Sequence, residues 1–416
     1  MKQTDLFLKT KKEALKDDTS LNSQLLYRAG YIDKTMAGAY ALLPLGFKLH
    51  ENICNLIREE LKPLNAQEVK LNVLTPKENW VKTDRWDNFD ALFRIKSSYG
   101  SELALGATHE EIITPLAKNY IKSYKDLPFS LYQIQTKLRD EARPKGGLLR
   151  LREFTMKDLY SFHENREDLD KYYEKVKKAY LKIFKSLKLK VYSVAASGET
   201  FSNLSDEFLT PSDIGEDEIL ICEKDEKHFC KKSDAGEIQT CPICKSNIKK
   251  VKVAELAHIF KLETKFTKAF DVTFLNKEGK QNFVYMGCYG IGISRIMGIL
   301  AENFADSKGL YFPKSVAPFS VHLIPLYSKD KKINDKINKE LLNIQTKLEK
   351  NNITYLYDNR EISNSIKLVE SDLIGLPNRI VISEKTLENN SFEFKERNKK
   401  SSKIISLKNF DEKLIK

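Results

Sequence analysis

The chain of 416 residues has no apolar run long enough to cross a lipid bilayer. Its most apolar early stretch, Met36 to Phe47, is interrupted by Pro44 and falls short of the ~20 residues that a membrane-spanning helix needs. The first residues, MKQTDLFLKTKKEAL, mix charges and lack the apolar core of a secretory signal. We therefore expect a cytoplasmic protein that has no membrane partner.

Cysteine is scarce, and six cysteines in a chain of this kind do not indicate a disulfide framework. Four of them cluster: Cys222, Cys230, Cys241 and Cys244, the last two forming C-P-I-C. One interpretation is a zinc ribbon that holds a structural Zn²⁺, with His228 as a possible substitute ligand. The other is a set of unmetallated thiols, since the gap from Cys222 to Cys230 is not a usual zinc-knuckle spacing. Both interpretations stay open.

The common glycine-rich phosphate-binding motifs are absent. Gly290 and Gly292 are followed by Arg295 where a dinucleotide fingerprint needs its third glycine, and no G-x-x-x-x-G-K-[ST] occurs. An arginine in the first turn of a helix instead places a cation beside backbone N–H groups, which suits a polyphosphate.

Acidic residues are outnumbered: 70 Lys and Arg stand against 58 Asp and Glu, a net charge of +12. The excess favours a polyanion such as nucleic acid as partner. A Lys-rich, solvated surface explains the same excess, so charge alone does not decide. The length predicts two to four domains.

Apolar periodicity predicts helices from about Phe47 to Leu61 and after Asn165. Between them, Leu131–Tyr160 is expected to form an antiparallel hairpin around the turn Arg143–Gly147.

After Pro318 a strand–helix–strand–helix–strand pattern predicts a small three-layer α/β domain. The Lys/Asn-rich tract Glu388–Lys403 is expected to be a loop and an exposed edge.

The hairpin carries the strongest chemical pattern. Arg139 and Glu141 are two apart and share a face if the strand continues through them. The even positions of the return strand are Arg150, Arg152, Phe154, Met156, Asp158 and Tyr160. Guanidinium groups match phosphate oxygens and a phenyl ring stacks on a base, so this face suits a nucleotide. The alternative is a solvated polar face with Phe154 exposed by accident.

These residues resemble known motifs. Arg139-x-Glu141, Arg150 and Arg152-Glu153-Phe154 resemble motif 2 of class II aminoacyl-tRNA synthetases, and Gly290–Arg295 resembles motif 3. Further segments are similar to prolyl-tRNA synthetases of the bacterial type: Thr108–Glu111, Leu127-Pro128, Leu131–Glu141, Arg143-Pro144, Met156–Asp158 and Tyr160–Phe162.

The resemblance implies a fold and a domain division. It implies an α+β catalytic domain with a mainly antiparallel sheet over 1–320 and a C-terminal α/β anticodon-binding domain over 321–416. Within the first, it places motif 1 at about 47–80, motif 2 at about 131–163, motif 3 at about 283–302 and a Cys-rich insert at about 220–250. A homodimer is implied too, although Asn72 stands where motif 1 carries its proline.

The implied activity is the synthesis of prolyl-tRNA. L-proline and ATP, with Mg²⁺, give prolyl-adenylate, and the prolyl group then passes to the 3′ end of tRNA(Pro). The roles implied at the nucleotide are Arg139 on the α-phosphate, Glu141 on the adenine amino group, Phe154 on the adenine face, Arg150 on a second phosphate, Arg295 on the γ-phosphate and Glu255 on the ribose or Mg²⁺. Those implied at proline are Thr108 and Glu110 on the imino group, Arg139 on the carboxylate side, Asp158 and His163 as walls, and Cys288 and Gly290 as the floor.

In the C-terminal domain the resemblance points to Asp358, Arg360 and Glu393 as anticodon contacts. No room exists between motifs 2 and 3 for the large editing domain that bacterial-type enzymes usually carry there. An apolar pocket rejects a smaller amino acid by only ~1–3 kcal/mol per methylene, so we expect alanine to be misactivated and not cleared in cis. Two other hypotheses are a tRNA-binding protein that does not aminoacylate and a class II enzyme for threonine, serine or glycine.

Overall fold

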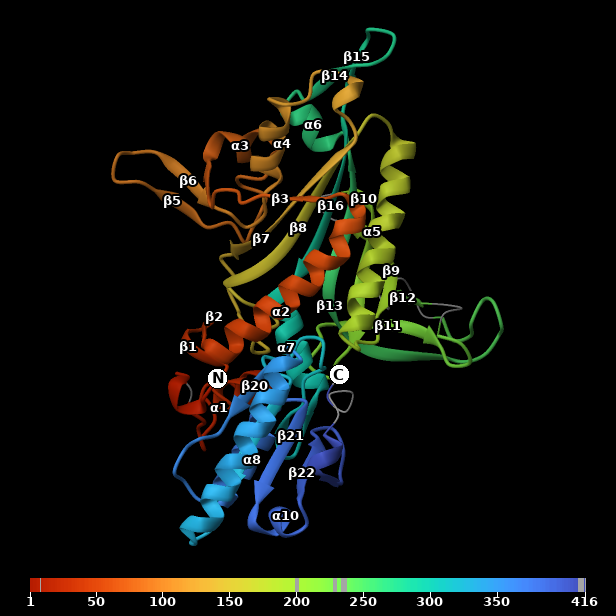
Figure 1. Cartoon of the computed structure of the whole chain (residues 1–416). Helices are drawn as coiled ribbons and strands as arrows, with labels where there is room; N and C mark the ends of the chain where they lie inside the picture. The colour runs from red at the N-terminus through yellow and green to blue at the C-terminus, as the bar shows by residue number, and fades with distance from the viewer. Residues whose placement is uncertain (8, 199–201, 227–229, 233–237, 411–414, 416) are drawn as a thin grey trace. The chain divides into compact units, whose positions relative to one another are not determined.

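The computed structural model describes residues 1–416 apart from 8, 199–201, 227–229, 233–237, 411–414 and 416 (Figure 1). The chain forms two compact units. The terminal unit comprises Met1–Thr35, Tyr40–Ile53 and Met297–Lys416, and the central unit comprises Met36–Ala39 and Cys54–Ile296. In the described part of the chain, no helix combines the length and the hydropathy of a membrane span.

The central unit is built on a nine-stranded sheet. Its main path runs β12 (Cys230–Lys232), β11 (Asp217–Cys222), β13 (Ile248–Glu263), β16 (Tyr285–Gly292), β8 (Glu153–His163), β7 (Phe129–Leu138) and β3 (Gln67–Glu68). Off this path, β10 (Ser202–Pro211) pairs with β13 and with β9 (Tyr192–Gly198). All these pairs are antiparallel except β3 with β7. The prediction of a mainly antiparallel sheet is confirmed.

The predicted hairpin is present as β7 and β8, which pair from Phe129↔Phe162 to Leu138↔Glu153. The strands end earlier than the even-position pattern assumed. Arg150 and Arg152 precede β8, and Arg139 and Glu141 follow β7. The loop between the strands therefore carries several of the predicted nucleotide contacts.

Helix α5 (Arg166–Ser186) begins where the sequence predicts, because the Asn165 side chain accepts a hydrogen bond from the backbone N–H of Asp168 at 2.9 Å. The helix buries one apolar stripe: Leu169, Tyr173, Val176, Tyr180 and Ile183, each at most 2% exposed. The predicted helix near Phe47–Leu61 is α2 (Pro44–Leu61).

The smaller elements of the central unit surround the start of α4 (Glu110–Lys118). They are α3 (Lys77–Lys82), α6 (Lys265–Ala269), the sheet of β4 (Leu74–Pro76), β6 (Glu102–Leu105) and β5 (Arg94–Lys96), and the ribbon of β14 (Thr273–Leu275) and β15 (Gln281–Phe283). Helix α7 (Ile293–Asn303) follows β16 directly, so Arg295 lies in its first turn as predicted.

The terminal unit contains a five-stranded sheet in the order β20 (Tyr355–Tyr357), β19 (Val321–Leu326), β21 (Asn378–Ser383), β22 (Ser391–Glu396) and β23 (Lys403–Ser406). The first three strands are parallel, and β22 and β23 are antiparallel. Its helices are α8 (Lys331–Lys350), α9 (Asn364–Ile374) and α10 (Glu384–Glu388). The remaining elements are α1 (Leu21–Arg28), β1 (Ile32–Met36), β2 (Ala39–Leu42), β17 (Ala305–Asp306) and β18 (Gly309–Leu310).

One prediction for this unit is wrong. Residues 388–403 were expected to form a loop and an exposed edge; the loop and the edge strand β23 account for 397–403, but 391–396 are β22, a strand inside the sheet whose Phe392 and Phe394 are buried in the domain core. The two rings alternate with polar residues at the period of a strand, and the surrounding Lys and Asn residues conceal that alternation in the composition.

Candidate functional site

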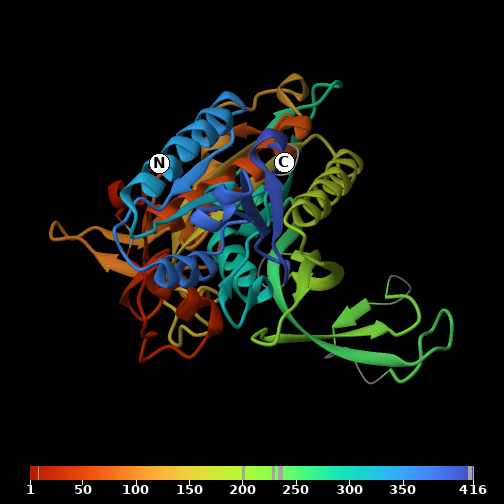
Figure 2. The ribbon, with the colours of Figure 1, turned by 60° about the horizontal axis from the view of Figure 1, so that its bottom comes forward.

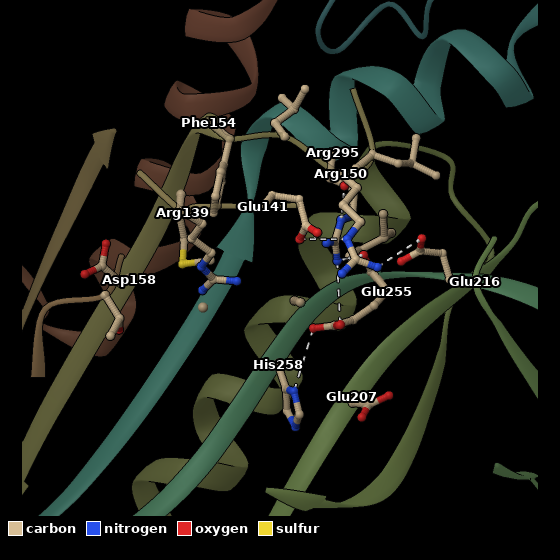
Figure 3. A pocket seen from close by; sticks show the side chains of 18 of the residues that line it. Arg139, Glu141, Arg150, Phe154, Asp158, Glu207, Glu216, Glu255, His258 and Arg295 are labelled. Atoms are coloured by element: carbon tan, nitrogen blue, oxygen red, sulfur yellow. Dashed lines mark hydrogen bonds and ion pairs between the residues drawn. The ribbon is translucent and has the colours of Figure 1, made fainter. Parts of the chain in front are cut away.

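The central unit contains a cavity of about 470 Å³ where β13, β16 and β8 are neighbours (Figure 3). Its walls come from the segment before α4, the loop between β7 and β8, the start of α7 and these strands. The residues predicted for catalysis, ATP and proline converge there with one exception, His163. Those lining it are Thr108, Glu110, Arg139, Glu141, Arg150, Phe154, Asp158, Glu255, Cys288, Gly290 and Arg295.

One part of the cavity presents an aromatic face and a cation. The guanidinium carbon of Arg139 lies 5.3 Å from the centroid of the Phe154 ring, and its Nε donates to the carbonyl of Ala107 at 3.3 Å. Figure 3 shows both side chains on the side of the cavity nearer Asp158. A ring flanked by a held guanidinium can stack a base and contact a phosphate together.

Glu141 and Arg150 pair with each other at the loop between β7 and β8. Nε of Arg150 lies 2.7 Å from Oε2 of Glu141, and its Nη1 lies 3.5 Å from Oε1 of Glu216. Burial is the largest single influence and raises the pKa of Glu141, but the hydrogen bonds from Arg150 and from the Arg143 backbone N–H, with the charges of Arg150 and Arg139, together outweigh it, so the pKa is lowered. Glu141 is therefore an ionised acceptor.

Arg295 ties two walls of the cavity together. Its Nε donates to the carbonyl of Leu149 at 2.9 Å and its Nη1 to the carbonyl of Glu255 at 2.8 Å. The Glu255 carboxylate lies 3.6 Å from Arg295 Nη1 and 3.7 Å from Nδ1 of His258. A cation is thus fixed at the start of α7, where backbone N–H groups add to its attraction for anions.

Another part of the cavity is acidic. Glu110 is fully buried, and its Oε2 accepts from Oγ1 of Thr108 at 2.5 Å while its Oε1 accepts from Sγ of Cys288 at 3.1 Å. The pair predicted two residues apart, Thr108 and Glu110, is therefore one hydrogen-bonded unit at the cavity wall. Such a unit can receive an ammonium group.

Asp158 is held from behind by a buried lysine. Nζ of Lys137 lies 2.7 Å from Oδ1 of Asp158 and 2.6 Å from Nδ1 of His109. Burial and the nearby Lys137 charge lower the pKa of His109 to about 4, so the ring is neutral near pH 7. It accepts from Lys137 at Nδ1, and its Nε2–H donates to the carbonyl of Asn72 at 3.2 Å.

His163 does not line the cavity, which corrects the prediction that it walls the proline pocket. Positions 154, 156 and 158 of β8 face the cavity, whereas 163 is an odd position and faces the other side of the sheet. Its Nδ1 lies 2.6 Å from Oδ2 of Asp168, and its Nε2 lies 2.8 Å from Oγ of Ser161.

Several lining or supporting residues were not predicted: Met156 as a wall, Glu207, Glu216, Asp217, and, behind the wall, Arg85, Glu111 and Lys137. Glu216 stands directly before β11, and Glu207 lies in β10, opposite His258 of β13. A charged residue in the sequence normally indicates a solvated position. Arg85, Glu111, Lys137 and Glu207 are buried beside residues far along the chain, and the exposed Glu216 reaches the cavity through its pair with Arg150, so no local pattern marked them.

The cysteine cluster lies at the far end of the β11–β13 ribbon, which extends away from the rest of the sheet in Figure 2. The Sγ atoms of Cys222, Cys241 and Cys244 all lie within 4.8 Å of one another, and those of Cys222 and Cys244 are 3.4 Å apart. Lys245 has a φ of 60°, so the C-P-I-C segment closes in a tight turn. The side chain of Cys230 and all of His228 lie outside the described residues.

The three predicted anticodon contacts differ in their surroundings. Asp358 is fully buried, and both of its oxygens accept from Arg360 at 2.7 Å. Glu393 lies in β22, with Oε1 4.0 Å from Nη2 of Arg379. Asp358 is thus a support for Arg360 and not an exposed contact, because its carboxylate is already satisfied.

Comparisons with known proteins agree with this geometry. Residues 93–304 match the family model of the class II tRNA synthetase core domain (G, H, P, S and T), and residues 320–416 match that of the anticodon binding domain. Two solved structures share the fold. Giardia lamblia prolyl-tRNA synthetase in complex with prolyl-adenylate has a TM-score of 0.79 at 21% identity, covering 93% of this chain and 75% of that one. The Cryptosporidium parvum enzyme with L-proline and AMP has a TM-score of 0.76 at 19% identity, covering 94% and 76%.

Sequence relatives are closer. The proline–tRNA ligase of Ehrlichia canis is 36% identical over 432 aligned residues that span the whole of both chains. That of Anaplasma phagocytophilum is 34% identical over 98% of each chain. That of Thermodesulfovibrio yellowstonii is 30% identical in an alignment of 556 positions that covers 98% of this chain and 97% of that protein. This chain belongs to the proline–tRNA ligase family of class II aminoacyl-tRNA synthetases.

Proposed function

We propose that the cavity of the central unit forms prolyl-adenylate from L-proline and ATP and then transfers the prolyl group to the 3′ end of tRNA(Pro). The observation that carries the proposal is the convergence, in one cavity, of a buried Thr108–Glu110 unit and an Arg139–Phe154 platform. The first suits the secondary ammonium of proline. The second suits a base and a phosphate.

The chemistry follows from this division. A carboxylate oxygen of proline attacks the α-phosphorus of ATP and pyrophosphate leaves; a hydroxyl of the terminal adenosine then attacks the carbonyl carbon and AMP leaves. Both steps develop charge at phosphate oxygens or at the carbonyl oxygen, so positioned cations lower the barriers. We assign this work to Arg139 at the α-phosphate and to Arg295 at the γ-phosphate. Phe154 stacks on adenine, and Glu141 accepts from its amino group.

Class II synthetases use ATP with Mg²⁺, and the cavity offers suitable donors. Mg²⁺ prefers oxygen ligands, and the carboxylates of Glu207 and Glu255 line the cavity. When bound with ATP, the ion neutralises charge on the leaving pyrophosphate. Arg295 Nη1 donates to the Glu255 carbonyl and lies 3.6 Å from its carboxylate, so it helps to position that side chain.

Proline-dependent exchange of pyrophosphate into ATP tests the first step. We expect exchange with proline and none with threonine, serine or glycine. Exchange with one of those amino acids alone would assign the chain to another specificity. Binding of tRNA(Pro) without exchange for any amino acid would support the hypothesis of a tRNA-binding protein and refute the enzyme.

We also propose that this enzyme misactivates alanine and does not clear the product in cis. Among the described residues, the segment 212–254 between β10 and the cavity part of β13 supplies only β11, β12, the cysteine-rich turn and the first residues of β13. Purified protein should leave alanyl-tRNA(Pro) intact, with deacylation at the uncatalysed rate. Rapid hydrolysis by the protein alone would refute this.

A structural Zn²⁺ is proposed at Cys222, Cys241 and Cys244, with Cys230 as the fourth ligand. Tetrahedral Zn–S bonds of ~2.3 Å place sulfur atoms roughly 3.8 Å apart, and the described thiols are already gathered at comparable separations. Elemental analysis should find one Zn²⁺ per chain, lost in C241S. A metal content near zero in protein purified without chelator would favour unmetallated thiols.

Two further parts of the proposal concern macromolecular partners. Residues 321–416 form the anticodon-binding domain, and 1–320 the catalytic domain with the Cys-rich insert at about 220–250. In the anticodon-binding domain, Arg360, which pairs with Asp358 and Glu370, is the first candidate for a contact with the anticodon.

The enzyme acts as a homodimer. Light scattering on the protein as it elutes from a gel-filtration column measures its mass and tests this directly. A monomer mass at micromolar concentration would refute the dimer.

A further inference from the structure

Behind the acidic wall of the cavity lies a buried arginine, Arg85, that touches no part of the cavity itself. Its Nη1 lies 3.3 Å from Oε2 of Glu110 and 2.9 Å from Oε1 of Glu111. The side chain is 3% exposed and both carboxylates are fully buried. One guanidinium is therefore shared by two neighbouring carboxylates, of which only Glu110 reaches the cavity.

The position of Arg85 is fixed by rings on three sides. Its guanidinium carbon lies 5.0 Å from the ring centroid of Phe89 and 5.5 Å from those of Trp80 and Phe266. These residues come from α3, from the loop after it and from α6. Contact with three rings restricts the movement of the guanidinium, so Arg85 orients the carboxylates that pair with it.

Glu111 has its own second support. Oγ1 of Thr83 donates to Oε1 of Glu111 at 2.9 Å, the same oxygen that Arg85 contacts. Oε2 of Glu110 receives Arg85 on one side and Thr108 on the other. The chain of contacts thus runs from Thr83 through Glu111 and Arg85 to Glu110.

The charges in this chain do not balance. Two ionised carboxylates and one guanidinium leave an excess of one negative charge in a region from which water is excluded. Burial raises the pKa of Glu111 to about 7, so this excess is present in the molecules whose Glu111 is ionised. If Glu111 were absent, Arg85 would neutralise Glu110 alone, and the wall would attract a cation weakly. With Glu111 present, a cationic ligand at Glu110 completes the balance.

We propose that Arg85 is a positioning residue for Glu110. Glu111 shares the positive charge of Arg85, so that Glu110 is not fully neutralised and stays able to bind the secondary ammonium of proline. The inference rests on the proposed function, since it concerns the amino-acid end of that cavity. Neither Arg85 nor Glu111 touches the substrate.

A buried ion pair that only stabilises the fold is the competing explanation, and variants separate the two. E111Q keeps the shape and the oxygen acceptor but removes the charge. R85M/E111Q removes the guanidinium and one carboxylate together, so the net charge of the wall is kept. R94M is the control: Arg94 is an exposed arginine of the same region that donates to the carbonyl of Trp86, and no contact of it with either glutamate is among its interactions in the described part of the chain.

The readout is pyrophosphate exchange with KM measured separately for proline and for ATP, alongside the thermal midpoint. We expect E111Q and R85M/E111Q to raise the KM for proline about tenfold or more while the KM for ATP changes less than about twofold. R94M should leave both KM values as in the wild type. R85K, which keeps the charge but not the planar fork, should fall between wild type and the double variant.

An unchanged KM for proline in folded E111Q and R85M/E111Q would overturn the inference, as would equal rises in both KM values. If the double variant does not fold, E111Q and R85K test the inference through the same comparison, the change in KM for proline against the change in KM for ATP. A wild-type protein without proline-dependent exchange would refute the proposed function, and this inference with it.

Discussion

Nε of Arg150 lies 2.7 Å from Oε2 of Glu141, so two residues assigned to different parts of ATP are paired with each other. The contact occupies one of the five N–H donors of Arg150 and one of the two carboxylate oxygens of Glu141. Arg150 therefore acts first on Glu141, whose carboxylate it directs, and only secondarily on a phosphate.

Substitution of Arg150 by methionine tests this order of action. We expect the KM for ATP to rise about tenfold and the KM for proline to stay unchanged, because the variant releases Glu141 from its orientation. Stability should change by about 1 kcal/mol or less, since the Arg150 side chain is 42% exposed. A rise in the KM for proline of the same size would contradict the assignment.

Arg295 is predicted to need its planar fork and not merely its charge. Arg295→Lys keeps the cation but cannot donate to the carbonyls of Leu149 and Glu255 in the same geometry. We expect kcat for pyrophosphate exchange to fall roughly 10- to 100-fold. Arg166→Lys, at an exposed ion pair with Glu263, is the control and should retain full activity.

Replacing one partner of the Lys137–Asp158 pair should lower the stability of the protein far more than replacing both. D158N leaves Lys137 buried without its carboxylate and should destabilise the central unit by about 3–5 kcal/mol. K137M/D158N should cost much less than the sum of the single changes. Urea unfolding followed by tryptophan fluorescence measures this directly, because Trp80 and Trp86, the only tryptophans, both belong to the central unit. Additive costs would contradict the pairing.

Lys157 should make stability depend on pH above neutrality. Its amino group is fully buried, bonded to the hydroxyl of Tyr180 and to the carbonyl of Tyr289, and burial lowers its pKa to about 7. Between pH 7 and the usual lysine pKa near 10.4, the unfolded chain holds a proton that the native chain has lost, so stability rises with pH by up to about 1.4 kcal/mol per unit.

The variant K157M should lack that slope and gain most over the wild type below pH 7. The control K175M removes an exposed lysine of α5 and should keep the wild-type slope. The same urea titrations at pH 6.5, 7.5 and 8.5 give the answer. Equal slopes in wild type and K157M would show that Lys157 is protonated throughout this range.

The local patterns of the sequence succeeded where one segment carries its own signal. The hairpin of β7 and β8, the Asn165-capped α5 and the arginine in the first turn of α7 follow from turn residues, periodicity and spacing. The same patterns failed in β22, where the many Lys and Asn residues hide the alternation of buried and exposed positions. They also failed at the hairpin, where the strands were expected to extend to Glu141 and Arg150 but end at Leu138 and Glu153. His163 was misplaced because alternation along β8 puts it on the face opposite Asp158.

The sequence by itself determined the antiparallel hairpin and, through the resemblance that its motifs carry, the family and eleven of the residues that line the cavity, because motifs and strand alternation are local properties of the chain. Only the tertiary structure decided which charges are buried and what each one faces. Glu110 meets Cys288 across 178 positions and Arg85 across 25, and no local pattern records such separations. The chemistry of a carboxylate depends on its neighbours in space, since a partner within about 4 Å in a dry site outweighs every sequence neighbour that faces water.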